Sequence, residues 1–178
     1  RRSEIQRETK DLRLEDLIVD EEMVVTVSHT GYIKRNPISL YRTQRRGGRG
    51  KVGMGTKEED FVSMLFIASM HTYVLFFSDQ GKVYWLKVHE LPEAGRASKG
   101  RAIVNLLSLS PGEEIASILP VREFTEGKFV MTATKLGIIK KTDLMEYSRP
   151  RAGGIISMGL NEGDRLIAHE LGHIAAAS

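Results

Sequence analysis

A threefold internal repeat is the feature that most limits how this chain can fold. Residues 25–35, 75–85 and 131–141 share one pattern: β-branched or aromatic residues, a hydroxyl residue, two variable positions, a glycine and an alternating strand. The glycines of the three copies are Gly31, Gly81 and Gly137. The pattern predicts three β-hairpins in which this glycine takes a positive φ angle.

The second half of the unit repeats as well. Equivalent apolar segments, which we predict as buried strands, occupy residues 60–65, 114–119 and 165–170. A basic, glycine-bearing loop precedes each of them, at residues 45–50, 96–101 and 149–154. Repeats of about fifty residues with several short strands are typical of propeller blades. We therefore expect an all-β fold, a β-pinwheel or propeller-like array of about three four-stranded blades.

The repeat also divides the chain. We expect an acidic linker and entry strand over residues 1–22, a single domain over 23–170 and a divergent or non-native tail over 171–178. The blades are expected at about residues 23–70, 71–124 and 125–170. Each blade buries its apolar face against its neighbours, and terminal blades need covering. Three blades therefore indicate an open arc or a fragment of something larger.

The charge is unevenly distributed along the chain, although its net value is only +3. Residues 1–22 carry eight acidic and five basic side chains, whereas residues 23–57 carry eight basic side chains and no acidic one. A run of one sign is most often a solvated surface. Here the run is rich in glycine and recurs in weaker form in the later repeats, which favours an anionic partner.

The segment with the densest positive charge is Gln44-Arg45-Arg46-Gly47-Gly48-Arg49-Gly50. Glycines let a backbone lie close against a partner, and arginines supply forked donors that match phosphate geometry. Duplex DNA, with about one negative charge per 1.7 Å of its axis, is a natural partner for such a loop. The segment has no aromatic residue, which disfavours the stacking that is typical of single-strand recognition.

Residues 44–50 resemble the seven-residue motif that distinguishes the C-terminal domain of DNA gyrase A from the related domain of topoisomerase IV. Residues 15–18, 29–35 and 159–164 resemble the same family, and the resemblance runs from about residue 12 to 167. It implies a β-pinwheel with strands exchanged between blades and duplex DNA wrapped on a basic rim, so that the ATP-driven enzyme introduces negative supercoils. The family domain has roughly six such repeats, twice the number in this chain.

The expected DNA-binding residues are the motif itself and basic side chains of the hairpins and later loops. They are Gln44, Arg45, Arg46, Gly47, Gly48, Arg49, Gly50, Lys51, Lys34, Arg35, Arg42, Arg96, Lys99, Arg101, Lys140, Arg149 and Arg151. The resemblance implies double-stranded DNA, the remainder of gyrase A, and gyrase B as partners. It also implies a cytoplasmic, nucleoid-associated protein. We expect no cofactor, metal, small-molecule substrate or membrane contact.

Enzyme motifs fit the sequence poorly. Residues 169–173 read H-E-x-x-H, but they continue a predicted strand, on which two histidines four apart do not form the helical zinc site. Residues 48–53 read G-x-G-x-x-G without the strand and helix that a dinucleotide site needs. The resemblance places the cleaving tyrosine and the ATPase outside this chain. The open alternatives are a topoisomerase IV-type domain, a propeller-like protein scaffold and incidental metal binding by His169 and His173.

Overall fold

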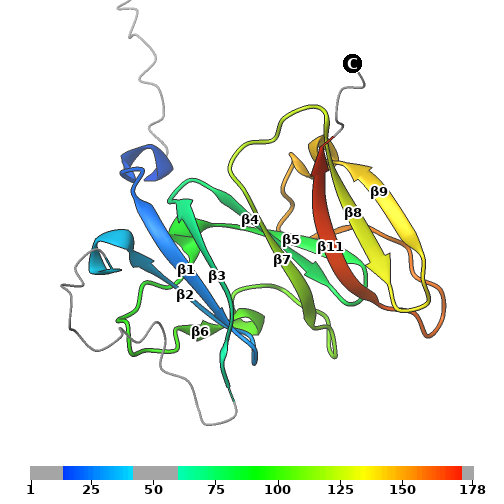
Figure 1. Ribbon diagram of the computed structural model, residues 1–178, viewed down its shortest axis with the longest axis horizontal. Helices are drawn as coiled ribbons and strands as arrows, with labels where there is room; N and C mark the ends of the chain where they lie inside the picture. The colour runs from blue at the N-terminus through cyan, green and yellow to red at the C-terminus, as the bar shows by residue number, and fades with distance from the viewer. Residues whose placement is uncertain (1–13, 42–59, 174–178) are drawn as a thin grey trace, which may run out of the picture.

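The computed structural model describes residues 14–41 and 60–173, which form strands joined by turns and single-turn 3-10 helices (Figure 1). These residues contain no α-helix, and hence no helix long and apolar enough to cross a membrane. The strands are β1 (Glu22–Ser28), β2 (Tyr32–Pro37), β3 (Val62–Ser69), β4 (Tyr73–Ser78), β5 (Lys82–Lys87), β6 (Arg101–Ala102), β7 (Ile115–Val121), β8 (Lys128–Thr134), β9 (Ile139–Asp143), β10 (Ile155–Ile156) and β11 (Leu166–His173). The 3-10 helices are η1 (Leu14–Leu17), η2 (Ile38–Tyr41), η3 (Val88–Glu90), η4 (Ile103–Asn105) and η5 (Leu144–Tyr147).

Three antiparallel sheets lie side by side along the long axis of the molecule (Figure 1). Their strand orders are β3-β1-β2-β6, β10-β5-β4-β7 and β11-β8-β9. The all-β, blade-like architecture is therefore confirmed. In the described part of the chain, the first two sheets have four strands and the last has three.

Each four-stranded sheet takes one of its two edge strands from the following repeat. Strand β6 comes after β5 in the chain but pairs with β2 of the first sheet, where Ile33 faces Arg101. Strand β10 comes after β9 but pairs with β5, where Val83 faces Ile155. The sheets in space therefore do not coincide with consecutive segments of the sequence, and the exchanged strands tie neighbouring sheets together.

The three predicted hairpins are confirmed, and they share one turn geometry. Their glycines, Gly31, Gly81 and Gly137, have φ angles of 85°, 78° and 88°. The hydroxyl oxygens that accept a hydrogen bond from the backbone N–H four residues later belong to Ser28, Ser78 and Thr134. A side-chain acceptor and a residue that tolerates positive φ are the two requirements of such a tight turn. Both recur at the same spacing.

Two details of the predicted buried strands are corrected. In the pairs β1–β3, β4–β7 and β8–β11 the register shifts at the same place, and this aligns Val62 with Ile115 and Leu166. The predicted segment of the first repeat, residues 60–65, is therefore displaced by one residue relative to residues 114–119 and 165–170. Strand β3 is also not buried, because Leu65 and Ile67 are more than half exposed. It lies in a terminal sheet, and only its alternate residues pack toward the core.

Two hydrophobic clusters hold the sheets together, and β4 contributes to both. Val74 and Phe76 lie in the cluster shared with the first sheet, which includes Val25. Leu75 and Phe77 point the opposite way, into the cluster shared with the third sheet. All four β4 side chains are fully buried, and burying one such side chain contributes about 1.5–3 kcal/mol. The central sheet is thus covered on both faces, as its nearly continuous apolar sequence requires.

Candidate nucleic-acid interface

The structure describes eight of the expected DNA-binding residues: Lys34, Arg35, Arg96, Lys99, Arg101, Lys140, Arg149 and Arg151. The others lie outside the described residues: Arg42, Gln44, Arg45, Arg46, Gly47, Gly48, Arg49, Gly50 and Lys51. The G-x-G-x-x-G pattern of residues 48–53 lies there as well. The described residues fall into two groups, some that hold the fold together and some that present charge to solvent.

Lys34 belongs to the first group, because its side chain lies inside the molecule. It is fully buried, and its ammonium donates hydrogen bonds to the carbonyl oxygens of Gly95 and Arg96 at 3.0 and 2.7 Å. Burial lowers the pKa of this ammonium, and the nearby Arg96 acts in the same direction. The neighbouring Asn36 donates to the Ala94 carbonyl. Side chains of strand β2 therefore bind the basic loop of the next repeat through hydrogen bonds to the backbone carbonyl oxygens of that loop.

Arg35 and Trp85 make the same hydrogen bond in successive repeats. The Arg35 Nε donates to the Leu91 carbonyl at 2.9 Å, and the Trp85 Nε1 donates to the Tyr147 carbonyl at 2.9 Å. The two donors occupy equivalent hairpin positions, and the two acceptors occupy equivalent positions in the following repeat. In the second repeat the tryptophan thus replaces the arginine as the side chain whose hydrogen bond links one repeat to the next. Arg35 also forms an ion pair with Glu93.

The loop held by β2 carries three cations of its own. The Arg96 guanidinium lies 5.4 Å from the Tyr41 ring centroid, and the Lys99 ammonium lies 5.4 Å from that of Tyr32. Arg101, on the exchanged strand β6, is exposed. Cations over aromatic faces are held in place while keeping a charged group near solvent. The loop therefore presents positive charge on a fixed backbone.

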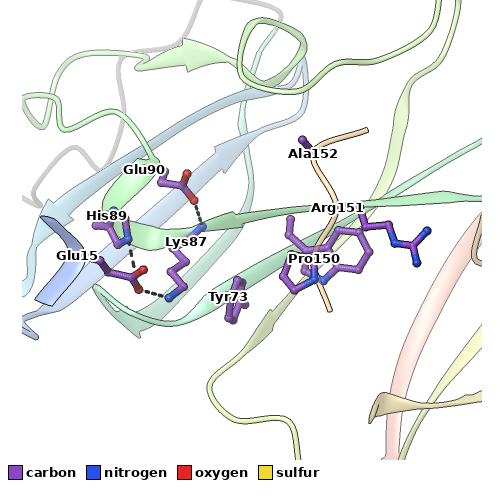
Figure 2. Close-up of a pocket in the computed structure, with 9 residues that line it drawn as sticks. Glu15, Tyr73, Lys87, His89, Glu90, Pro150, Arg151 and Ala152 are labelled. Atoms are coloured by element: carbon purple, nitrogen blue, oxygen red, sulfur yellow. Dashed lines mark hydrogen bonds and ion pairs between the residues drawn. The ribbon is translucent and has the colours of Figure 1, made fainter. Parts of the chain in front are cut away.

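The third repeat presents charge at the equivalent places. Arg149 and Arg151, in the loop before β10, are both exposed. Arg151 lines a pocket together with Tyr73 and Trp85 of the second sheet (Figure 2). Lys140, on β9, is exposed, although its ammonium donates to the Ser157 carbonyl at 2.6 Å. Arginines in this setting match the forked geometry of phosphate oxygens.

The loops end at glycines that bring two backbones into contact. Gly100 has a φ of +82°, and a Cβ atom at this position would collide with the Ile33 carbonyl oxygen. Gly154 has a φ of +71°, and a Cβ there would lie 2.8 Å from the Tyr84 ring. No L side chain fits such a place without displacement of backbone or ring. These glycines fix where each basic loop leaves the neighbouring sheet.

The H-E-x-x-H segment lies on a strand, as predicted, because β11 runs from Leu166 to His173. Residues four apart on a strand are about 13 Å apart along the chain, too far for the helical zinc site. A different group of ligands is brought together elsewhere in the described residues. Single ligand atoms of Glu15, His71 and His89 all lie within 4.8 Å of one another. Nothing in the local sequence indicates this cluster, because its members are far apart along the chain.

Solved structures share this fold. The C-terminal domain of DNA topoisomerase IV matches with a TM-score of 0.73 and 24% identity, covering 86% of this chain and 46% of that one. The DNA gyrase A C-terminal domain matches with a TM-score of 0.63 and 24% identity, covering 86% and 49%. Exchanged strands between repeated sheets define the class of protein: the chain is an array of propeller-type, pinwheel blades.

Sequence comparison then identifies the family. The profile described as "DNA gyrase C-terminal domain, beta-propeller" matches residues 22–69, 72–122 and 128–168. The chain is 52% identical over 171 residues to the DNA gyrase A protein of Salmonella typhimurium and 50% identical over 171 residues to that of Escherichia coli. These matches cover 96% of this chain and 20% of each relative. The chain therefore belongs to the DNA gyrase C-terminal domain family and spans about a fifth of the length of these relatives.

Proposed function

We propose that the chain is a non-catalytic module that binds duplex DNA and bends it along a basic rim. The observation that carries the proposal is the repeated placement of arginines next to an exchanged strand. Arg101 in the second repeat, and Arg149 and Arg151 in the third, are exposed on loops anchored to the preceding sheet. Membership of the gyrase family supports DNA as the anion that these loops meet.

The strongest anchor in this proposal is the motif of the first repeat. Arg45, Arg46, Arg49 and Lys51 lie between β2 and β3 in the chain, the position that the other two basic loops occupy in their repeats. Arg42 and the motif residues Gln44, Gly47, Gly48 and Gly50 belong to the same proposed contact. Three arginines within five residues repel one another unless an anion compensates them. Duplex phosphates at the rim do so.

The proposed contacts position DNA without reading its bases. Arginine and lysine side chains directed at phosphates fix the path of a duplex and carry no sequence information. Any preference among sequences then comes from how easily each one bends. We propose that the later loops, with Arg96, Lys99, Arg101, Arg149 and Arg151, and Lys140 on β9 continue the path begun at the motif. Arg35 and the buried Lys34 act indirectly, by holding the second loop in place.

In the whole enzyme, we propose that this bending presents a DNA crossing of one hand to the strand-passing core. The core would comprise the remainder of gyrase A, with the cleaving tyrosine, and gyrase B, with the ATPase. Strand passage through such a crossing introduces negative supercoils. The same proposal places the protein in the bacterial cytoplasm, at the nucleoid. The DNA gyrase A relatives that it matches support this assignment.

The salt dependence of binding tests the contact. We expect the affinity for a linear duplex to fall steeply with added salt, and the triple variant R45A/R46A/R49A to flatten this dependence. The matched control R122A/K135A/R165A removes three exposed cations outside the basic loops and is expected to change the slope less. Equal slopes for the wild type and R45A/R46A/R49A would contradict the role proposed for the motif.

A topological assay tests the bending. A relaxed plasmid is incubated with the chain and a nicking-closing topoisomerase, and the DNA is then freed of protein. Wrapping leaves a change in linking number, whereas a scaffold whose basic loops meet an acidic protein leaves none. A linking number that stays at the protein-free value over the full range of bound protein would contradict wrapping.

A further inference from the structure

One carboxylate and two imidazoles from distant segments converge beside the pocket shown in Figure 2, which labels Glu15 and His89. Glu15 lies in η1, His71 in the turn before β4, and His89 in η3. The Glu15 Oε1 is 3.6 Å from the His71 Nδ1 and 3.9 Å from the His89 Nε2. A tetrahedral zinc ion with bonds of about 2.0–2.2 Å separates its ligand atoms by about 3.3–3.5 Å. Small side-chain movements therefore suffice to reach a metal-binding geometry.

The His71 ring is already oriented as a metal ligand. Its Nε2 lies 2.9 Å from the Ile18 carbonyl oxygen, which can only accept, so this nitrogen carries the proton. In the neutral ring the Nδ1 then holds a lone pair, and it faces the Glu15 carboxylate. Metal-bound histidines almost always donate their second N–H to a carbonyl or carboxylate in this way. Two electron-rich atoms that face each other favour a cation between them.

The His89 ring supplies a second, independent observation. Its Nε2 is buried and has no hydrogen-bond partner among the described residues. A buried polar atom without a partner keeps the cost of losing its hydration without the gain of a hydrogen bond. The carboxylate oxygen opposite, at 3.9 Å, is too far away for a hydrogen bond. A metal ion placed between the two would satisfy both.

The Lys87 ammonium is the cation that pairs with this carboxylate in the structure (Figure 2). It holds the pKa of Glu15 below its ordinary value, so the carboxylate is ionised at neutral pH. Lys87 also has a second partner, because its Nζ lies 4.8 Å from the centroid of the Tyr73 ring. Attraction to the ring face can hold the ammonium when the carboxylate turns to another ion. Lys87 is therefore a competitor that can be displaced.

We propose that Glu15, His71 and His89 form a binding site for a divalent transition-metal ion of the zinc class. Two imidazoles and one carboxylate suit zinc, and three protein ligands leave the fourth position of a tetrahedron to water. Because the ligands come from η1 and from both ends of the β4–β5 hairpin, bound metal would fasten the segment before the first sheet to the second sheet. Binding would also raise the stability of the fold.

Calorimetric titration of the metal-free 178-residue chain with Zn²⁺ tests the proposal. We expect one site, and a loss of affinity of about tenfold or more in His71→Gln and in His89→Gln. We expect Lys87→Gln to bind Zn²⁺ more tightly, because the competing cation is gone. His29→Gln is the matched control, since the His29 ring stacks on Phe61 outside the cluster.

The double variant His169→Gln/His173→Gln distinguishes this site from the H-E-x-x-H segment. The proposal expects it to keep the site, and Zn²⁺ binding that is lost in this variant but kept in His71→Gln and His89→Gln would overturn the proposal. So would the absence of Zn²⁺ binding to the wild-type chain. If the ligand variants fail to fold by circular dichroism, the Lys87→Gln titration decides, and unchanged or weaker affinity in that variant overturns the proposal.

Discussion

At the scale of single residues, one carboxylate just before the last strand of the first repeat, and one just before that of the third, hold a hairpin turn in place. Asp60 accepts hydrogen bonds from the backbone N–H and the hydroxyl of Thr30, at 3.0 and 2.5 Å. Asp164 accepts from the Leu136 N–H at 3.0 Å. Burial alone would raise the pKa of Asp60, but the donors of Thr30, Ser28 and Phe61 outweigh it and lower the pKa to about 2. The ionised form therefore stabilises the folded state.

This shift predicts how stability depends on acid. Because the folded pKa of Asp60 lies below its ordinary value of 3.8, its contribution is complete above about pH 4 and is lost as the pH falls toward 2. In Asp60→Asn we expect a lower free energy of unfolding at neutral pH and a weaker loss between pH 4 and 2. Urea unfolding across this range measures both. The same acid-induced loss in wild type and variant would contradict the assignment.

Because Arg35 and Trp85 are equivalent, we predict that the contacts of Arg35 can be introduced at position 85. Glu93, the ion-pair partner of Arg35, is equivalent to Arg149 in the third repeat. We expect Trp85→Arg alone to be strongly destabilised, because its new guanidinium would face Arg149. Trp85→Arg/Arg149→Glu should recover part of this loss, with a coupling free energy of about 0.5–1 kcal/mol in a double-mutant cycle. Additive effects of the two substitutions would show that the positions do not correspond.

At the scale of elements, the exchanged strands are too short to be stable by themselves. Strand β6 pairs with β2 through two residues, and strand β10 pairs with β5 through two residues. They are held by the side chains that donate to their loops, from Lys34, Arg35, Asn36 and Trp85, and by the close backbone contact at Gly100 and Gly154. The exchange therefore depends on tertiary contacts that surround the strands.

Substitution of the glycine at this contact should weaken the exchange. In Gly100→Ala we expect a loss of about 2 kcal/mol or more in the free energy of unfolding, because the methyl group meets the Ile33 carbonyl and φ is positive. Gly95→Ala in the same loop is the control, since a Cβ there meets no atom within 4 Å. Chemical denaturation of both variants gives the comparison. Similar losses at the two positions would argue against a close contact.

At the scale of the whole molecule, the repeat places one basic loop beside each exchanged strand. The exposed arginines that the structure describes in the later basic loops are Arg101, Arg149 and Arg151, and they come from two successive loops. A duplex that follows the rim would meet them in turn, and each phosphate neutralised releases counterions. The contribution of the loops to DNA binding should therefore add up along the path.

This additivity can be measured in the variant R101A/R149A/R151A. We expect the slope of log affinity against log salt to fall by up to about three, since each phosphate contact contributes about 0.9. Lys34→Gln removes a buried lysine, and we expect it to leave the slope close to that of the wild type. Fluorescence anisotropy with a labelled duplex at several salt concentrations measures both. A larger change in Lys34→Gln than in the triple variant would contradict the division into structural and exposed cations.

The sequence by itself determined the repeat, the three hairpins and the family, because these follow from residues close together in the chain. A hydroxyl residue and a glycine three positions later specify the turn wherever they occur. The local sequence pattern also predicted that residues 169–173 lie on a strand, and β11 contains them. Such features need no knowledge of which segments meet in space.

Only the tertiary structure decided which segments pair and which charges reach solvent. Two-residue strands have no periodicity to detect, so the partners of β6 and β10 could not be predicted from the repeat pattern. Lys34 is adjacent to Arg35 and shares its charge, yet it is buried because carbonyl oxygens of the next repeat meet its ammonium. Glu15, His71 and His89 likewise come together only because distant segments of the chain pack against one another. Burial and proximity depend on long-range packing, which local sequence does not encode residue by residue.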